Sequence, residues 1–227
     1  MLAIVSNEQV IKVLRQYNPW WRNPSAIKEE SKPQKRLAYY EALKTIKHKT
    51  LRRFAVLSGA RRVGKTTIMY QMIENLIDEG VSPKNILYVS FDNPIVKLVN
   101  VETVLSIYES LYPARGTKYI FLDEIQYTEH WELWMKVIYD TQSNIRLTAT
   151  GSASPISEKG TTDSGTGRWS VLKIPTTSFY EYCSLLQLEE PLLPDNLKLT
   201  NLVKMNPAQL GDLMNGFSPL EGYLTAI

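Results

Sequence analysis

The octapeptide Gly59-Ala60-Arg61-Arg62-Val63-Gly64-Lys65-Thr66 constrains the fold of this chain more than any other feature of the sequence. It matches the phosphate-loop pattern G-x-x-x-x-G-K-[ST], in which two glycines let the backbone turn so that its N–H groups face an anion. An apolar run, Phe54–Ser58, precedes the octapeptide, and an amphipathic stretch, Thr66–Glu79, follows it. A strand, a glycine-rich turn and a helix in that order are typical of the phosphate-loop fold.

Short apolar runs alternate with amphipathic stretches over the next hundred residues. We expect strands at 54–58, 86–91, 119–122, 145–150 and 169–174, and helices at 66–79, 101–112 and 129–141. Strands that are apolar on both faces and alternate with helices predict a parallel sheet covered on both sides. The predicted fold is therefore α/β: a P-loop NTPase with a five-stranded parallel sheet sandwiched by helices.

Composition excludes several other classes of protein. Hydrophobic residues make up 44% and charged residues 22% of the 227 positions, which is typical of globular chains and not of disordered ones. The single cysteine, Cys183, excludes an internal disulfide framework and a cysteine-based zinc site. No apolar run approaches the ~18 residues that span a bilayer, so we expect a cytoplasmic protein without a membrane segment. A net charge of +3 falls well short of a dedicated nucleic-acid coat.

The phosphate loop predicts a site for ATP and Mg²⁺. The ammonium group of Lys65 can reach the β- and γ-phosphates, the helix beginning near it adds a positive dipole end, and the Thr66 hydroxyl can bind magnesium. The predicted nucleotide-binding residues are Gly59, Ala60, Arg61, Arg62, Val63, Gly64, Lys65, Thr66 and Thr67.

Two further strand ends carry polar side chains. Asp123 and Glu124 follow the apolar run 119–122; we expect Asp123 to hold magnesium and Glu124 to activate the attacking water as a general base. Thr150 and Ser152 lie at the end of the fourth strand. We expect this strand to lie between the strand that precedes the phosphate loop and the strand that precedes the two acids. There they can bond the γ-phosphate or the water, or serve only in the turn around Gly151. GTP is disfavoured because the sequence holds no N-K-x-D tetrapeptide.

An ordered string of motifs resembles one family. The motifs are Gly59–Thr67, Phe121–Gln126, Trp131 with Leu133 and Asp140, Thr150–Ser152, Gly167-Arg168, and Pro175 with Ser178, Phe179 and Glu181. Together they resemble the AAA-type ATPases of archaea and bacteria that carry a second domain of unknown function, DUF4143. The resemblance covers roughly residues 10–227 and implies an AAA-like ATPase domain followed by a winged-helix or nuclease-like region. The terminal Leu220-Glu221-Gly222-Tyr223 resembles the family's G-G-Y-P turn, from which Glu221 and Leu224 depart.

Three regions are expected on this basis: an N-terminal helical segment at 1–50, the P-loop ATPase core at 51–176 and a helical C-terminal extension at 177–227. Ser178 and Glu181 form a predicted capping box at the start of that extension. Because the chain stops at an apolar end, Leu224–Ile227, we expect the extension to begin a second, truncated domain.

Arg168 is the predicted charge-compensating arginine for the γ-phosphate. It follows the Gly-, Ser- and Thr-rich stretch 160–167, opens the fifth strand, and stands where the family pattern places an arginine. A guanidinium can bind phosphate oxygens bidentately, within its own chain or on a neighbouring subunit. The alternative is a simple ion pair with a surface carboxylate.

Other conspicuous residues admit two interpretations. Trp20 and Trp21 either dock the N-terminal helix or stack on the adenine, and Gln126 either supports the fold or contacts the nucleotide. The basic stretch 44–53 is either a solvated helix end or a patch for nucleic acid.

Two functions remain in competition. The first is Mg-dependent ATP hydrolysis that drives a conformational change read by a second domain or a partner. The alternative is a slow-hydrolysing, ATP-dependent switch that binds DNA or protein, with a homo-oligomer compatible with either. A small-molecule kinase is the least favoured, because the stretch before Arg168 offers a poor basic lid.

Overall fold

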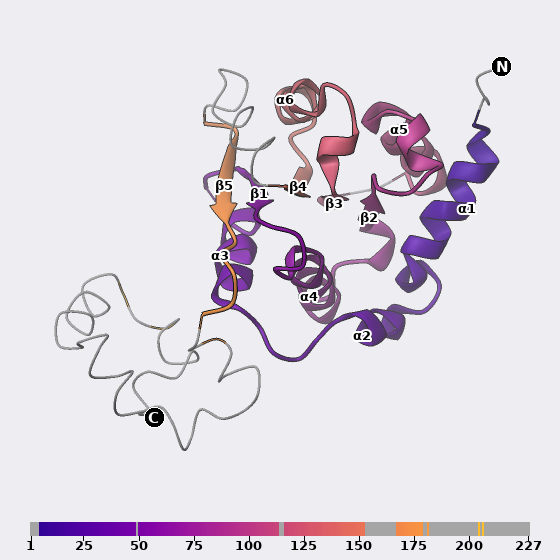
Figure 1. The fold of residues 1–227 in the computed structure, drawn as a ribbon. Coiled ribbons are helices and arrows are strands. Elements are labelled where there is room, and N and C mark those ends of the chain that lie inside the picture. Colours follow the sequence, from indigo (N-terminus) through magenta and orange to yellow (C-terminus); the bar gives the residue numbers. More distant parts are fainter. Residues whose placement is uncertain are drawn as a thin grey trace.

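A computed structural model describes residues 5–48, 50–113, 116–152 and 167–178, together with Glu181, Lys204 and Asn206. Its centre is one parallel sheet with the strand order β2-β3-β4-β1-β5. The strands are β1 (Phe54–Ser58), β2 (Ile86–Ser90), β3 (Lys118–Asp123), β4 (Ile145–Gly151) and β5 (Trp169–Lys173). All five predicted strands are confirmed, with bounds that differ by no more than one residue at either end (Figure 1).

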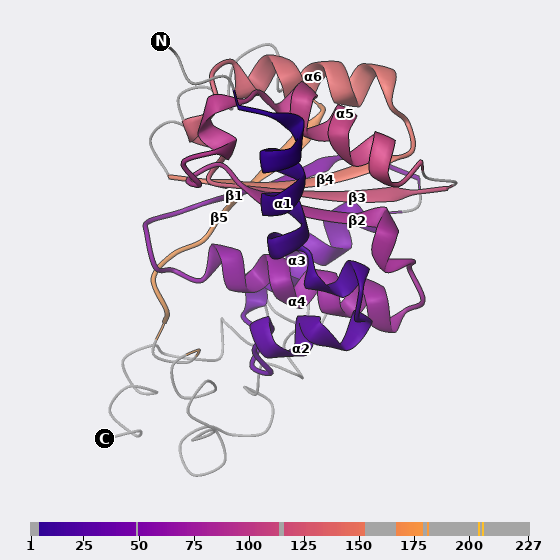
Figure 2. The ribbon, with the colours of Figure 1, turned by 90° about the vertical axis from the view of Figure 1, so that its right-hand side faces the viewer.

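Helices cover both faces of the sheet (Figure 2). One face carries α2 (Ile27–Glu30), α3 (Leu37–Ile46) and α4 (Lys65–Asp78), and the other carries α5 (Val101–Leu111) and α6 (Trp131–Thr141). Every residue of β1 and of β2 is buried, as an apolar strand covered on both sides requires. Short 3-10 turns complete the described elements: Pro19–Trp21, Pro24–Ala26, Pro83–Asn85, Val96–Leu98 and Ile125–Tyr127.

The strand order brings three strand ends together. Strand β4 pairs with β1 on one side and with β3 on the other, as the sequence predicts, and β5 flanks β1. Since all strands run in the same direction, their carboxyl ends lie together on one side of the sheet, the carboxyl edge, and their amino ends on the opposite side, the amino edge. The residues after β1, β3 and β4 therefore lie side by side, which sets the place of the site.

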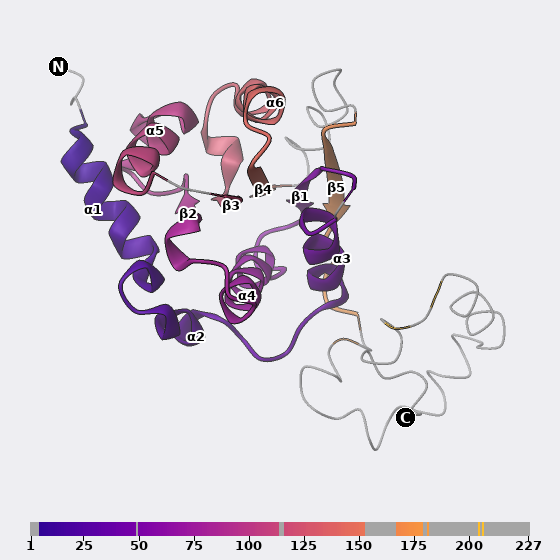
Figure 3. The ribbon, with the colours of Figure 1, turned by 180° about the vertical axis from the view of Figure 1, so that it is seen from behind.

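The N-terminal segment covers the β2 edge of the sheet. Helix α1 (Asn7–Tyr17) begins with a capping box between Ser6 and Gln9 and packs beside β2 (Figures 1 and 3). The Asn18 side chain then bonds both backbone groups of Tyr88, donating to its oxygen and accepting from its nitrogen at 2.7 Å each. The segment thus supplies partners that an edge strand would otherwise lack.

Helix α3 begins at Leu37, because Arg36 before it has extended backbone angles. Most of the predicted helical extension at 177–227, and all but Gly167 of the Gly-, Ser- and Thr-rich stretch at 160–167, lie outside the described residues.

Candidate functional site

The phosphate loop occupies the turn between β1 and α4. A Cβ atom on Gly59 would collide with the backbone carbonyl of Ile174, so the close approach of β5 to the loop requires glycine there. Gly64 has a φ of 89°, in the left-handed region that glycine adopts at little cost, and α4 begins at the next residue. The helix N-terminus therefore faces the loop, with its backbone N–H groups available to an anion.

The side chains of Lys65 and Thr66 bind different partners. The ammonium nitrogen of Lys65 donates to the carbonyls of Gly59, at 2.9 Å, and Ala60, at 2.8 Å. The hydroxyl of Thr66 donates to Oδ2 of Asp123 at 2.7 Å. Lys65 is therefore held over the loop by neutral acceptors, which an anionic phosphate can replace with a stronger charge-assisted bond.

Asp123 is the most heavily hydrogen-bonded acid of the site. It ends β3, is only 3% exposed, and accepts hydrogen bonds from the hydroxyls of Thr66, Tyr88 and Thr150. Burial, and then the charge of Asp123, raise the pKa of Tyr88, so its phenol stays protonated and donates at 2.8 Å. Hydroxyl and carboxylate oxygens are the ligands that Mg²⁺ prefers, so Thr66 and Asp123 together fit a magnesium ion.

Glu124 lies next to Asp123 but faces the open side. Its φ of 51° is unusual for a residue other than glycine and turns the chain sharply out of the sheet. Its backbone nitrogen donates to the Thr150 hydroxyl at 3.0 Å, and its carboxylate accepts a hydrogen bond from the side chain of Gln126. Thr150 thus joins both acids, while Ser152, just past the end of β4, is half-buried.

A hollow of about 660 Å³ opens beside these residues. Its wall holds three cations, Arg61, Arg62 and Lys65, two threonines of the α4 terminus, Thr66 and Thr67, the acids Asp92 and Glu124, and Tyr127. Arg61 donates to the Tyr127 hydroxyl at 2.7 Å, so this arginine is held at the rim. The volume and the excess of positive charge suit a polyphosphate.

The structure adds residues that the sequence analysis missed. Tyr88 bonds Asp123 across 35 positions of sequence, with no local pattern to announce it. Asp92 lines the hollow and accepts from the Ser90 hydroxyl at 2.6 Å. The sequence did contain a pattern that indicates Asp92, because this acid follows an apolar strand as Asp123 does. Tyr127 had no such signal.

Arg168 does not lie with the other predicted site residues. It precedes β5, whose first residue pairs with Phe54 and whose last pairs with Ser58, so one strand length, roughly 17 Å, separates it from the loop. Its guanidinium binds Asp140 at 3.0 Å and lowers the pKa of that carboxyl group. The prediction that Arg168 contacts the γ-phosphate bound by its own chain is therefore wrong. The loop follows the carboxyl end of β1, whereas Arg168 precedes the amino end of the parallel strand β5.

Burial and contacts decide the interpretation of the two tryptophans and show what two cations of the basic stretch bind. Trp20 and Trp21 are buried, and both indole nitrogens donate to the Ile86 carbonyl, so they dock the N-terminal segment and do not face the hollow. In the basic stretch, Arg52 donates to the carbonyls of Tyr139, Gln142 and Ile145, and Lys47 pairs with Glu79. Lys49 lies outside the described residues.

No helix in the described ranges is long and apolar enough to cross a membrane.

Two solved structures with a similar fold are proteins of Aeropyrum pernix. The ORC1 protein of Aeropyrum pernix, solved in complex with DNA, superposes with a TM-score of 0.52 at 15% identity, over 78% of this chain and 56% of that one. The ORC2 protein of the same organism, solved as ADPNP–ADP complexes, gives 0.50 at 14% identity, over 77% and 57%. These likenesses support the P-loop NTPase fold.

Relatives in sequence are uncharacterized proteins. One from Methanocaldococcus jannaschii is 31% identical over 140 residues, which are 59% of this chain and 29% of that protein. Another, from Haemophilus influenzae, is 28% identical over 129 residues, which are 56% and 32%. The chain thus spans about a third of the length of these relatives. A family model described as an AAA domain matches residues 51–183, more than half of the chain. The chain belongs to this AAA domain family.

Proposed function

We propose that the protein binds Mg-ATP in the hollow beside the phosphate loop and hydrolyses it. The observation that carries the proposal is the meeting of two acids with different surroundings at one strand end. Asp123 is buried and bonded to the Thr66 hydroxyl, whereas Glu124 lies on the wall of the hollow. Such a pair can divide metal binding and base catalysis between two carboxylates.

Each residue then has a role. Lys65 and the N–H groups of the loop bind the β- and γ-phosphates, and Thr66 and Asp123 would hold Mg²⁺, which neutralises phosphate charge when bound. Glu124 takes a proton from the water that attacks the γ-phosphorus, and the bond to the β-phosphate oxygen breaks to leave ADP. Thr150 holds the Glu124 backbone in place. Ser152, the residue after β4, is the second hydroxyl near that strand end.

The remaining parts of the proposal concern coupling and partners. Hydrolysis would drive a conformational change read by a second domain, such as DUF4143, or by a partner, in the cytoplasm. The alternative is a slow-hydrolysing switch that binds DNA or protein; it is supported by the similar fold of ORC1, which was solved with DNA. An arginine that cannot reach its own loop can still serve a neighbour, so a homo-oligomer also belongs to the proposal.

Calorimetry with Lys65→Ala tests the nucleotide site. Because Lys65 is the cation on the first turn of α4, its loss should weaken ATP binding at least tenfold, about 1.4 kcal/mol. Unchanged affinity would refute the site. The steady-state ATPase rate with and without duplex DNA separates the two functions: a rate raised by DNA supports coupled hydrolysis, and a slow rate with ATP-dependent DNA binding supports the switch.

A further inference from the structure

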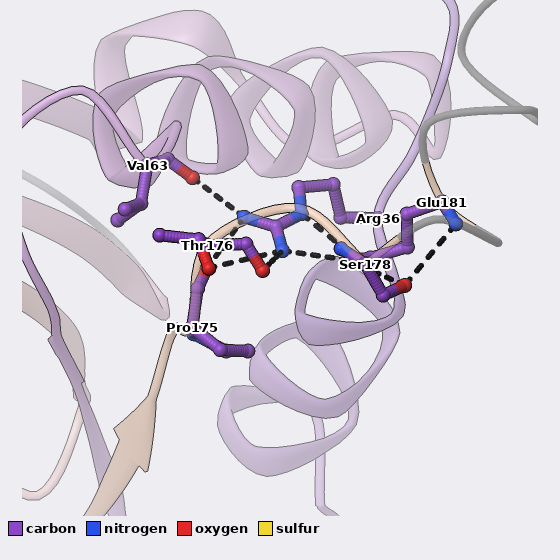
Figure 4. Close-up of polar contacts among 6 residues, drawn as sticks. All are labelled: Arg36, Val63, Pro175, Thr176, Ser178 and Glu181. Atoms are coloured by element: carbon purple, nitrogen blue, oxygen red, sulfur yellow. Dashed lines mark hydrogen bonds and ion pairs between the residues drawn. The ribbon is translucent and has the colours of Figure 1, made fainter.

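Arg36, the residue before α3, is buried between the phosphate loop and the chain that follows β5. Its residue is 8% exposed, and each nitrogen of its guanidinium donates a hydrogen bond (Figure 4). Nε and Nη2 form a fork with the two carboxylate oxygens of Glu181, at 3.1 and 2.7 Å. A buried, bidentate pair of this kind is among the strong polar contacts in proteins.

The same guanidinium holds the phosphate loop. Nη1 of Arg36 donates to the Val63 carbonyl at 2.7 Å. In a trans peptide the carbonyl oxygen and the next N–H point in opposite directions. Since the Val63 carbonyl points to Arg36, the N–H of Gly64 points away from Arg36, on the opposite side of that peptide bond. Gly64 lines the hollow, so Arg36 orients one of the N–H groups that phosphate would contact.

The chain after β5 in turn holds Arg36. The carbonyls of Pro175 and Thr176 accept further bonds from Nη1 and Nη2, at 3.2 to 3.4 Å. Glu181 is itself held by the predicted capping box, which the structure confirms: its backbone nitrogen donates to the Ser178 hydroxyl at 3.2 Å, and its carboxylate accepts from the Ser178 nitrogen at 3.3 Å. Burial opposes the charge of Glu181, but the bonds from Arg36 and Ser178 outweigh it and lower its pKa.

These contacts cannot change one at a time. The guanidinium is planar and its donors have fixed directions, so a rotation of this group that breaks its bonds to Glu181 also shifts its bond to Val63. Loss of Glu181 would moreover leave a buried cation without its counter-charge, which is strongly unfavourable. The loop and the Ser178–Glu181 turn are therefore linked through one rigid side chain, although 118 positions separate Val63 from Glu181.

We propose that Arg36 couples the phosphate loop to the Ser178–Glu181 turn, so that docking of this turn raises nucleotide affinity and nucleotide binding stabilises the docked turn. The inference rests on the proposed nucleotide binding and adds a means of regulating it. Arg36 is a positioning residue in this scheme, because it acts on the nucleotide only through the loop. Linkage requires the two effects to be reciprocal and equal in free energy.

Glu181→Gln tests the coupling, because glutamine keeps the shape of the side chain and removes its charge. We expect ATP affinity by calorimetry to fall about fivefold or more, the usual range of coupling between sites. The matched control is Glu79→Gln, which breaks the exposed pair with Lys47 at the far end of α4 and should leave affinity unchanged. Ser178→Ala removes the capping box alone and should lower affinity in the same direction by less. Equal affinities for Glu181→Gln and the unmodified protein would overturn the inference.

Hydrogen exchange supplies a readout that a general loss of stability would not move. ATP should slow exchange at the Glu181 amide in the unmodified protein, and unchanged exchange there would count against coupling. Without nucleotide, Glu181→Gln should speed exchange at the Ile68 amide, which donates to the Gly64 carbonyl at 3.0 Å, while the amides of β2 stay protected. This second comparison needs no ATP and therefore tests the coupling even if the unmodified protein binds none. A failure to bind ATP would refute the proposed function but not the link between the Ser178–Glu181 turn and the phosphate loop.

Discussion

At the carboxyl edge of the sheet, Lys65 and Thr66 lie at the N-terminus of α4 and line an open hollow, whereas at the amino edge Arg52 and Arg168 bind acceptors at the C-terminal end of α6. Arg52 donates to three carbonyls at and after the end of α6, and its guanidinium lies 4.4 Å from the centre of the Tyr139 ring. The two edges thus use cations for opposite purposes.

The difference follows from the direction of the helices. In a parallel α/β sheet each helix begins at the carboxyl edge and ends at the amino edge, so N–H groups face one edge and carbonyls the other. Cations at the amino edge stabilise helix ends, and anions are drawn to the carboxyl edge. The role of a basic residue therefore depends first on the edge of the sheet at which it lies, and only then on its neighbours in the sequence. Substitutions at the carboxyl edge should change activity, whereas those at the amino edge should leave the activity of the isolated chain unchanged.

The largest effect is expected for Glu124→Gln. Glutamine keeps the size of the side chain and its hydrogen bonding but cannot accept the proton of the attacking water. Turnover should fall by about 10²-fold or more, while ATP affinity stays within twofold. Single-turnover hydrolysis and calorimetry measure the two quantities separately. Hydrolysis at the parent rate would place the base elsewhere and remove the functional contrast between the edges.

Arg52→Ala should show the reverse pattern. Three carbonyls near the end of α6 lose their charged donor, which we expect to lower the free energy of unfolding by roughly 2 kcal/mol. ATP affinity at the opposite edge should not change. Urea denaturation gives the first quantity and calorimetry the second, with Arg15→Ala on the exposed face of α1 as the control. A loss of ATP binding at full stability would show that the amino edge acts on the site.

Tyr88→Phe probes the carboxyl edge more finely. It deletes one hydroxyl that donates to Asp123 and leaves the ring in place. The lost bond is worth about 1 kcal/mol, so the Mg²⁺ concentration for half-maximal hydrolysis should change about fivefold. Tyr108→Phe deletes a comparable hydroxyl, bonded to the Lys84 carbonyl, and serves as the matched control. Identical magnesium curves for both variants would remove Tyr88 from the site.

The smallest effect is expected for Arg168→Ala. Its pair with Asp140 is exposed, and such pairs add little stability, so the melting temperature should not change measurably. Hydrolysis by isolated chains should also persist, because Arg168 is one strand length from its own loop. A loss of activity that is restored by mixing with Lys65→Ala would show that Arg168 serves a neighbouring subunit. A loss that mixing leaves in place would contradict its position at the amino edge.

Sequence alone determined the strands, the phosphate loop and the two acids, because these features are local. Strands buried on both faces must be apolar throughout, and a loop that turns backbone N–H groups inward needs glycine at fixed spacing, so both leave a pattern in consecutive residues. The place of β4 between β1 and β3 was also predicted, from the acid pair together with the loop. Even the position of Arg168 was within reach, since a residue that opens a parallel strand lies at the edge away from the loop.

Only the tertiary structure decided which distant side chains meet. Asn18 and the two neighbouring tryptophans bond the backbone of β2, Tyr88 bonds Asp123, and Arg36 joins Val63 to Glu181. These contacts span from 27 to 145 positions, so no local pattern connects the two partners. A buried polar group must find a partner, but its own sequence neighbourhood does not name that partner. The packing of the helices and the order of the strands determine which partner it meets.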